Sequence, residues 1–153
     1  MPRKPSPSDT ALLLDHQLCF ALYSASLAMT KLYKPLLEPL GLTYPQYLAM
    51  LALWESDGLT VSELGDRLFL DSGTITPLVK RLEAAELVLR QRDTQDERRV
   101  QVWLTDTGRA LRRKAASVPG CVLDASQCSV KEVLALTREV QTLRDRLQQA
   151  IGS

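Results

Sequence analysis

The chain has 153 residues, of which 45% are hydrophobic and 24% are charged, and its formal net charge is +1. This length suffices for one ordinary domain with its own core, and the composition excludes a disordered chain, a collagen-like chain and a disulfide scaffold. No stretch approaches the roughly 18 uncharged apolar residues that span a bilayer, and the polar start MPRKPSPSDT is followed by no cleavage site. We therefore expect a cytoplasmic protein with no membrane partner and a flexible tail over residues 1–10.

Apolar residues spaced by three and four predict a first helix over residues 9–37, which Pro35 and Pro39 bring to an end. A second helix is expected to start near Pro45, where a missing N–H group costs little, and to run to Trp54. Its nearly continuous apolar sequence predicts a helix that is buried on most sides.

Two short helices follow, LTVSELGDRLFL and TITPLVKRLEAAEL, joined by the tight turn LDSG. In the first of them, Leu64, Leu68 and Phe69 are expected to face the core. This arrangement is typical of a helix-turn-helix, whose second helix enters the major groove of DNA.

The next segment, VLRQRDTQDERRVQVWL, predicts a β-hairpin with a charged tip. Val100, Val102 and Leu104 alternate with polar or exposed positions, as in a half-buried strand. A hairpin directly after a recognition helix is a wing, so residues 45–104 are predicted to form a DNA-binding winged helix-turn-helix. Residues 90–114 hold eight Lys and Arg against four Asp and Glu, a local excess of four positive charges that suits a DNA partner.

The C-terminal part predicts two more helices. One is capped by Thr105, carries the basic run RALRRK and is interrupted at Pro119. The other, from about Ser129 to Ala150, has apolar residues in an a/d seam that suits packing along another helix. The seam consists of Val133, Leu136, Val140, Leu143 and Leu147.

These elements predict a mainly α fold: a winged helix-turn-helix whose N- and C-terminal helices form a dimerisation domain. Residues 11–153 would make one such domain, with residues 11–40 and 115–153 as the dimerisation helices of a homodimer. The alternative is a monomer in which the first and last helices cover each other.

The order of elements resembles the MarR-type repressors. The strings LCFALYS, TYPQY and LDSGTITP, together with DERRV, resemble the organic hydroperoxide resistance (OhrR) branch of that family, and the resemblance extends from about Leu12 to Ile151. Two positions depart from the branch, which usually has Asn in place of His16 and Gly in place of Glu86. Because Gly would form a left-handed helix cap, Glu86 predicts a different exit from the recognition helix and a slightly different wing angle.

The resemblance implies that Cys19 is the residue that reacts with peroxide and that Tyr33 and Tyr44 are its hydrogen-bond partners. Tyr23 lies one helical turn from Cys19. Hydroxyl donors aimed at sulfur favour the thiolate, and the thiolate attacks a peroxide oxygen. The alternative is that Cys19 is a small core residue.

A sulfenic acid on Cys19 could condense with a second thiol, and the candidates are Cys121 and Cys128. We favour Cys121, because it follows Pro119-Gly120, where a helix start favours the thiolate and a break allows movement. The bond would join two subunits. All three cysteines are expected to be reduced at rest.

DNA contacts are expected from the recognition helix and from the wing. Arg98, or as a second choice Arg99, would enter the minor groove, with Asp96 orienting an arginine. Arg90 and Arg92 would meet the DNA backbone. The residues expected at the start and outer face of the recognition helix are Ser72, Thr74, Thr76, Pro77 and Lys80.

The sequence lacks the residues that hydrolytic catalysis or a zinc site would need. His16 is the only histidine, so no Ser-His-Asp set exists, and the cysteine spacing gives no zinc site. We expect no enzyme activity, no metal and no cofactor. The sequence predicts a repressor that binds a pseudo-palindromic operator as a dimer and is released when organic hydroperoxide oxidises Cys19. The alternatives are a MarR-like repressor released by a small aromatic ligand, and a thiol peroxidase.

Overall fold

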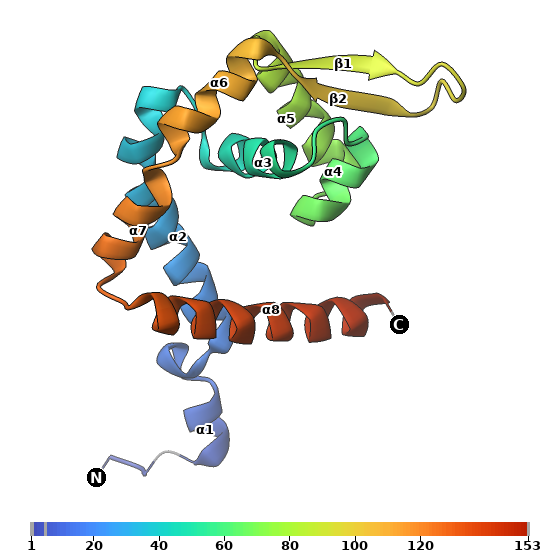
Figure 1. The fold of residues 1–153 in the computed structure, drawn as a ribbon. Coiled ribbons are helices and arrows are strands. Elements are labelled where there is room, and N and C mark those ends of the chain that lie inside the picture. Colours follow the sequence, from blue (N-terminus) through green and yellow to red (C-terminus); the bar gives the residue numbers. More distant parts are fainter. Residues whose placement is uncertain (1, 5, 153) are drawn as a thin grey trace. The chain divides into compact units, whose positions relative to one another are not determined.

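The computed structural model describes residues 2–4 and 6–152, in two compact units, Met1–Arg112 and Arg113–Ser153 (Figure 1). The predicted mainly α, winged helix-turn-helix fold is confirmed. No helix in the described part of the chain is long and apolar enough to cross a membrane. The elements are α1 (Pro7–Ala11), a 3-10 turn (Leu14–His16), α2 (Leu18–Leu37), a second 3-10 turn (Glu38–Leu40), α3 (Tyr44–Glu55), α4 (Val61–Leu68), α5 (Ser72–Ala84), β1 (Val88–Arg92), β2 (Val100–Leu104), α6 (Asp106–Ala115), α7 (Val118–Ser126) and α8 (Val130–Gly152).

The prediction of one continuous first helix was wrong. The Gln17 side chain donates hydrogen bonds to the carbonyls of Ala11 (2.7 Å) and Leu13 (2.9 Å), and its own backbone is extended. These bonds satisfy one carbonyl at the end of α1 and one just after it, so α1 stops and α2 starts anew at Leu18. Residues 7–10, expected to belong to a flexible tail, form α1 together with Ala11, and a capping box starts this helix.

The predicted C-terminal end of the first long helix is confirmed, because α2 contains Pro35 and ends at Leu37, just before the 3-10 turn that holds Pro39. The 3-10 turn that follows ends at Gly41, whose φ of 68° is readily available to glycine. Thr43 then caps α3 through a capping box with Gln46.

The core of the first unit lies between α3, α4, α5 and the hairpin. Leu53, Leu64, Val79 and Val102 are fully buried there. Phe69, predicted to face inward, is 52% exposed because α4 ends at Leu68 and Phe69 takes a left-handed φ of 58°. Its side chain therefore leaves the buried face of the helix.

The hairpin is antiparallel, with Val88 opposite Leu104 and Arg92 opposite Val100. It projects beyond α4 and α5 as a wing (Figure 1). The expected different exit from α5 was wrong. Glu86 itself adopts a left-handed φ of 62°, and the Leu87 N–H donates to the Leu82 carbonyl at 3.0 Å, as in a glycine-terminated helix.

In the second unit, Pro119 lies in the first turn of α7 and so helps to start a helix. Ser129 and Glu132 cap α8 through reciprocal hydrogen bonds of 3.1 and 3.3 Å. α8 has no buried residue.

Candidate functional site

The recognition helix α5 buries one face and exposes the other. Its N-cap Asp71 accepts a hydrogen bond from the Thr74 N–H at 2.9 Å, which fixes the start of the helix. Ile75, Leu78 and Val79 anchor it in the core. The structure places the residues predicted to contact DNA on the opposite side, where Ser72, Thr74, Pro77 and Lys80 are exposed and Thr76 is half-buried.

The wing tip is a tight turn built around Asp96. The Arg99 N–H donates to the Asp96 carbonyl at 3.0 Å, and the Asp93 N–H donates to the Arg99 carbonyl at 2.8 Å. The Asp96 carboxylate accepts bonds from the backbone N–H (3.1 Å) and the Nε (3.3 Å) of Arg98. Arg98 is 92% exposed. The arrangement presents one guanidinium to solvent on a turn that the carboxylate holds in shape.

Of the three other arginines of the hairpin, Arg92 is exposed, while Arg90 in β1 and Arg99 at the tip make ion pairs that the sequence analysis missed. Arg90 donates from Nε and Nη2 to Glu83 at 3.1–3.3 Å, and its backbone N–H donates to the same carboxylate at 3.2 Å. These hydrogen bonds lower the pKa of Glu83 from its usual value of 4.5. Arg99 donates from Nη2 to Glu63 at 3.1 Å.

A hollow of about 500 Å³ lies between α4, α5 and the hairpin. The three arginines Arg90, Arg98 and Arg99 line it together with hydroxyl side chains and one carboxylate, Glu63. Cations and hydroxyls together are the groups that proteins use to contact DNA phosphates. The remaining polar lining consists of Thr60, Ser62 and Thr76.

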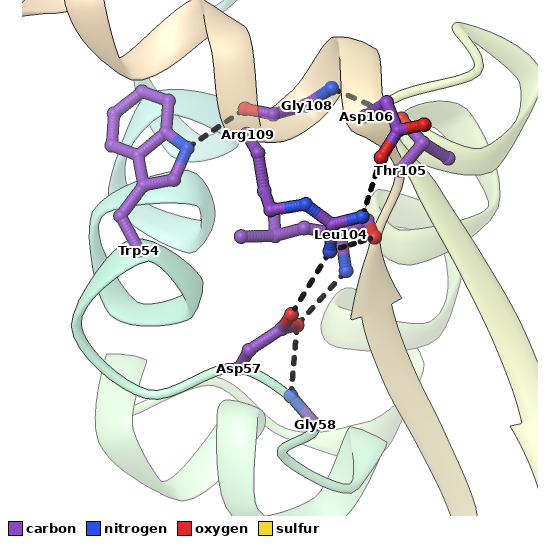
Figure 2. A network of polar contacts seen from close by, with 8 residues as sticks. All are labelled: Trp54, Asp57, Gly58, Leu104, Thr105, Asp106, Gly108 and Arg109. Carbon is purple, nitrogen blue, oxygen red and sulfur yellow. Dashed lines mark hydrogen bonds and ion pairs between the residues drawn. The ribbon is translucent and has the colours of Figure 1, made fainter.

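A network around Asp57 holds the base of the wing (Figure 2). The Asp57 Oδ1 accepts from the backbone N–H groups of Gly58 and Leu104, both at 2.9 Å. Arg109 lies 3.6 Å from Asp57 Oδ2, donates to the Leu104 carbonyl at 3.0 Å, and donates to Asp106 at 2.7 Å. One carboxylate and one guanidinium thus connect the turn after α3 with β2 and α6.

The same network includes close packing that the sequence did not reveal. The Trp54 Nε1 donates to the Gly108 carbonyl at 2.9 Å, which ties α3 to α6 (Figure 2). Gly58 has a φ of 78°, and a Cβ there would lie 2.5 Å from the ring of Trp103. The wing base therefore requires glycine at this turn.

Cys19 is an exposed thiol and not a core residue. Because α2 begins at Leu18, Cys19 lies in the first turn of a 20-residue helix, a position that sequence periodicity did not predict. Backbone N–H groups in a first helical turn attract negative charge. Tyr23, one turn further along, is also exposed.

Tyr33 and Tyr44 form an aromatic cluster with a third residue, Tyr47, that the sequence analysis did not single out. The Tyr33 ring centroid lies 4.8 Å from that of Tyr44 and 5.7 Å from that of Tyr47. Burial, with a smaller effect of Tyr44 and Tyr47, raises the pKa of Tyr33 to about 12, and burial also raises the pKa values of Tyr44 and Tyr47. All three phenols are therefore protonated donors at neutral pH.

The cluster can offer its hydroxyls to a group from outside. None of the three hydroxyls makes a hydrogen bond within the described residues, and no buried side-chain oxygen or nitrogen there is left unpaired. The hydroxyls of the half-buried Tyr33 and Tyr44 therefore reach the surface, whereas Tyr47 is only 2% exposed. They do not reach the thiol of their own chain, since the 14 residues from Cys19 to Tyr33 span about 21 Å of helix.

The other two cysteines belong to the second unit. Cys121 is exposed in the first half of α7, and its N–H donates to the Ser117 carbonyl at 3.2 Å. Cys128 is half-buried beyond the end of α7, with its Sγ 3.5 Å from the Ser126 carbonyl. Of the two, Cys121 is the more accessible. The described residues contain no cluster of three or more His, Cys, Asp or Glu side chains that could hold a metal ion.

The chain is similar to proteins that regulate transcription. A sequence profile of the family "Transcriptional regulator SarA/Rot" matches residues 31–114. The organic hydroperoxide resistance transcriptional regulator of Bacillus subtilis is 48% identical over 136 residues, which is 89% of this chain and 92% of that protein. The HTH-type transcriptional regulator TtmR of Methylorubrum extorquens is 48% identical over 99% of this chain and 80% of its own.

Solved structures that are similar to this chain also include DNA-binding proteins. The crystal structure of AbfR of Staphylococcus epidermidis has a TM-score of 0.76 at 31% identity, covering 94% of this chain and 99% of that chain. A structure of reduced AbfR bound to DNA has a TM-score of 0.73 at 32% identity, covering 92% and 97%. The similar proteins are regulators of transcription and not enzymes.

Proposed function

The chain belongs to the MarR-type winged-helix transcriptional regulators, in the branch of the organic hydroperoxide resistance regulators, and from this we propose that it is a peroxide-sensing repressor. It binds a pseudo-palindromic operator as a homodimer and leaves the DNA when an organic hydroperoxide oxidises Cys19. The observation that carries the proposal is the accessible Cys19 thiol in the first turn of α2.

The homodimer covers apolar surface that the single chain leaves exposed. Leu136, Val140 and Leu147, three residues of the predicted seam, are about half exposed on α8. On α2, Leu18 and Leu27 are similarly exposed. We infer that the partner is a second copy of the chain. A two-fold axis places the same apolar patch on both sides of the interface, so the two patches match.

The dimer also completes the thiol site. The thiol and the phenol cluster lie near opposite ends of α2, so two α2 helices packed antiparallel bring Cys19 of one subunit near the partner's Tyr33 and Tyr44. The hydroxyls of these tyrosines have no hydrogen bond within the described residues of the chain and are available to donate. Such donors stabilise a thiolate and the oxygen that it later carries.

The reaction is a two-electron transfer from sulfur to the peroxide. The Cys19 thiolate attacks the terminal oxygen of R–O–O–H, a sulfur–oxygen bond forms, and the O–O bond breaks. The alkoxide leaves and takes up a proton to become the alcohol, and Cys19 becomes a sulfenic acid. The thiolate of Cys121, or of Cys128, then attacks the sulfenic sulfur, which forms a disulfide and releases the oxygen as water.

DNA binding uses the exposed face of α5 in the major groove and Arg98 of the wing in the minor groove. Asp96 holds Arg98 at the wing tip through the hydrogen bond at 3.3 Å. Two recognition helices in a dimer would be spaced by about 34 Å or a multiple of it, the helical repeat of DNA. A disulfide between subunits would change that spacing and so weaken binding.

The structures of AbfR support a two-thiol switch. AbfR has been solved in reduced and overoxidized forms bound to DNA, and in a form with a disulfide. By analogy, the disulfide of this chain is the step that releases DNA, and the sulfenic acid is its precursor.

One observation favours the second candidate, release by a small aromatic acid. An apolar hollow of about 630 Å³, lined by Leu27, Leu37, Tyr44 and the two cations Lys31 and Lys34, lies between α2 and α3. Its size and lining suit an aromatic ring with a carboxylate. PcaV of Streptomyces coelicolor, with a TM-score of 0.77 and 26% identity, has been solved with its natural ligand.

The test separates the two candidates. Operator binding is titrated with cumene hydroperoxide, with hydrogen peroxide and with salicylate, each with and without a thiol reductant afterwards. The sensor predicts release by cumene hydroperoxide at about one equivalent per site, reversed by the reductant. Release by salicylate alone, at millimolar concentration and independent of the reductant, would instead establish the ligand-released repressor.

A further inference from the structure

The three arginines of the wing hollow are each paired with a carboxylate in the DNA-free chain. Arg98 pairs with Asp96 at 3.3 Å, Arg90 with Glu83 at 3.1 Å, and Arg99 with Glu63 at 3.1 Å. Each guanidinium that lines the hollow therefore has a carboxylate partner before DNA arrives.

The three pairs differ in what the carboxylate does. Asp96 shapes the wing tip, and its partner Arg98 remains almost fully exposed. Glu83 holds Arg90 at the guanidinium and at the backbone N–H, with both side chains only 34% exposed, so this pair secures the start of β1 to the end of α5. These two carboxylates have structural roles in the folded wing.

The pair between Glu63 and Arg99 has no such role. It consists of one contact between side chains that are 49% and 56% exposed, and it joins residues 36 positions apart on α4 and next to β2. An exposed ion pair of this kind contributes little to stability. Glu63 also lines the hollow itself, so its negative charge faces the space into which a phosphate would come.

We propose that Glu63 limits the affinity of the chain for DNA by competing with the phosphate backbone for Arg99. This inference rests on the DNA-binding function proposed above. When DNA enters the hollow, Arg99 contacts a phosphate only by leaving Glu63, and the freed carboxylate then repels the same backbone. Because phosphates carry no sequence information, Glu63 lowers the affinity of the chain for DNA of every sequence. The repressor is then bound weakly enough that a small further loss of contacts releases it.

The test is the Glu63→Gln variant, in which glutamine keeps the shape and removes the charge. Binding to a short fluorescein-labelled duplex of mixed sequence is measured by fluorescence anisotropy over a series of NaCl concentrations. We expect several-fold tighter binding at low salt. The plot of log K against log salt should be steeper by up to about 0.9 for each subunit bound, because Arg99 then contacts a phosphate in every complex and not only in those in which it has left Glu63. A change that merely disturbed the fold would weaken binding and would not steepen this slope.

The matched control is Glu55→Gln. Glu55 pairs with Arg67 at 2.8 Å, both side chains are exposed, and neither residue lines the hollow. This variant removes the same charge from the same unit, so its salt slope is expected to equal that of the wild type. An equal gain in both variants would show a general charge effect and would overturn the proposal.

A double variant tests the partner. In the Arg99→Gln background, Glu63→Gln should no longer tighten binding, because the arginine that it frees is absent. Persistence of the full gain, or a Glu63→Gln variant that binds like the wild type, would contradict competition for Arg99. Failure of the wild type itself to bind any duplex would contradict the DNA-binding function as well, and the same titration reports it.

Discussion

At the scale of single residues, the arginines of the wing differ in how free their side chains are to contact DNA. Arg98 is almost fully exposed, while Arg90 is bound by three hydrogen-bonding groups to Glu83. The sequence predicted Arg98 ahead of Arg99 from the DERRV string alone. It could not predict the carboxylate partners, because Glu63 and Arg99 are 36 positions apart and no periodicity connects them.

The Arg98→Ala variant should weaken operator binding and leave the fold and the dimer intact, because the side chain packs against no core residue. Losing one phosphate contact makes the slope of log K against log salt shallower by about one unit per subunit. Anisotropy titrations at several salt concentrations measure this. Arg67→Ala, outside the hollow, is the control, and an Arg98→Ala variant with wild-type affinity and slope would remove Arg98 from the DNA site.

The Glu86→Gly variant should be more stable than the wild type. Glu86 takes a φ of 62° at the exit of α5, a conformation that costs a residue with a Cβ roughly 1 kcal/mol relative to glycine. We expect the free energy of unfolding to rise by about 0.5–1 kcal/mol. The midpoint of urea unfolding should therefore increase while the m value stays unchanged. Glu86→Ala retains the strain and should show no such gain; if both variants gain equally, the strain at this position is not the cause.

At the scale of elements, the Asp57 network explains how the base of a two-stranded wing is held. The hairpin alone would be marginal in water. Hydrogen bonds from Gly58 and Leu104 to Asp57, and the contacts of Arg109, attach its base to α3 and α6 (Figure 2).

The Gly58→Ala variant tests this attachment. A methyl group at φ 78° would lie 2.5 Å from Trp103, so the turn or the indole must shift. We expect a loss of about 1–3 kcal/mol in the free energy of unfolding. DNA affinity should weaken as well. Gly120→Ala, where a Cβ meets nothing within 4 Å and φ is not positive, is the control, and similar effects of both substitutions on unfolding would contradict the proposed packing.

The order of the elements was predictable because each has its own periodicity and cap signals. Thr60 caps α4 and Asp71 caps α5, and both are residue types that favour this position. The break before α2 was not predictable, because it depends on the Gln17 side chain bonding to carbonyls earlier in the chain. Tyr47 was missed because its place in the aromatic cluster depends on a contact with Tyr33 in space, and the sequence spacing of the two residues does not indicate that contact.

At the scale of the whole molecule, the proposed function depends on two copies acting together. Within one chain, Cys19 and Tyr33 lie near opposite ends of α2, so the proposed thiol site needs the tyrosines of a second copy. The apolar face of α8 has no buried residue in the single chain. The dimer, the thiol site and the spacing of the recognition helices are therefore parts of one proposal. An experiment that detects a disulfide between subunits tests all three.

Oxidised protein should migrate as a disulfide-linked dimer on a non-reducing gel, because the Cys19 sulfenic acid of one subunit meets a second thiol of the other. Cys121 is exposed and Cys128 is half-buried, so Cys121→Ser should abolish the band and Cys128→Ser should retain it. The opposite pattern would make Cys128 the second thiol.

The most direct test of the central claim is the operator binding of Cys19→Ser before and after organic hydroperoxide. We propose that residues 72–99 make the DNA contacts, so the reduced variant should bind the operator as the wild type does. Serine cannot form the sulfenic acid that starts the switch, so cumene hydroperoxide should release the wild type and leave the variant bound. Release of Cys19→Ser at the same peroxide concentration as the wild type would contradict a sensor based on this thiol.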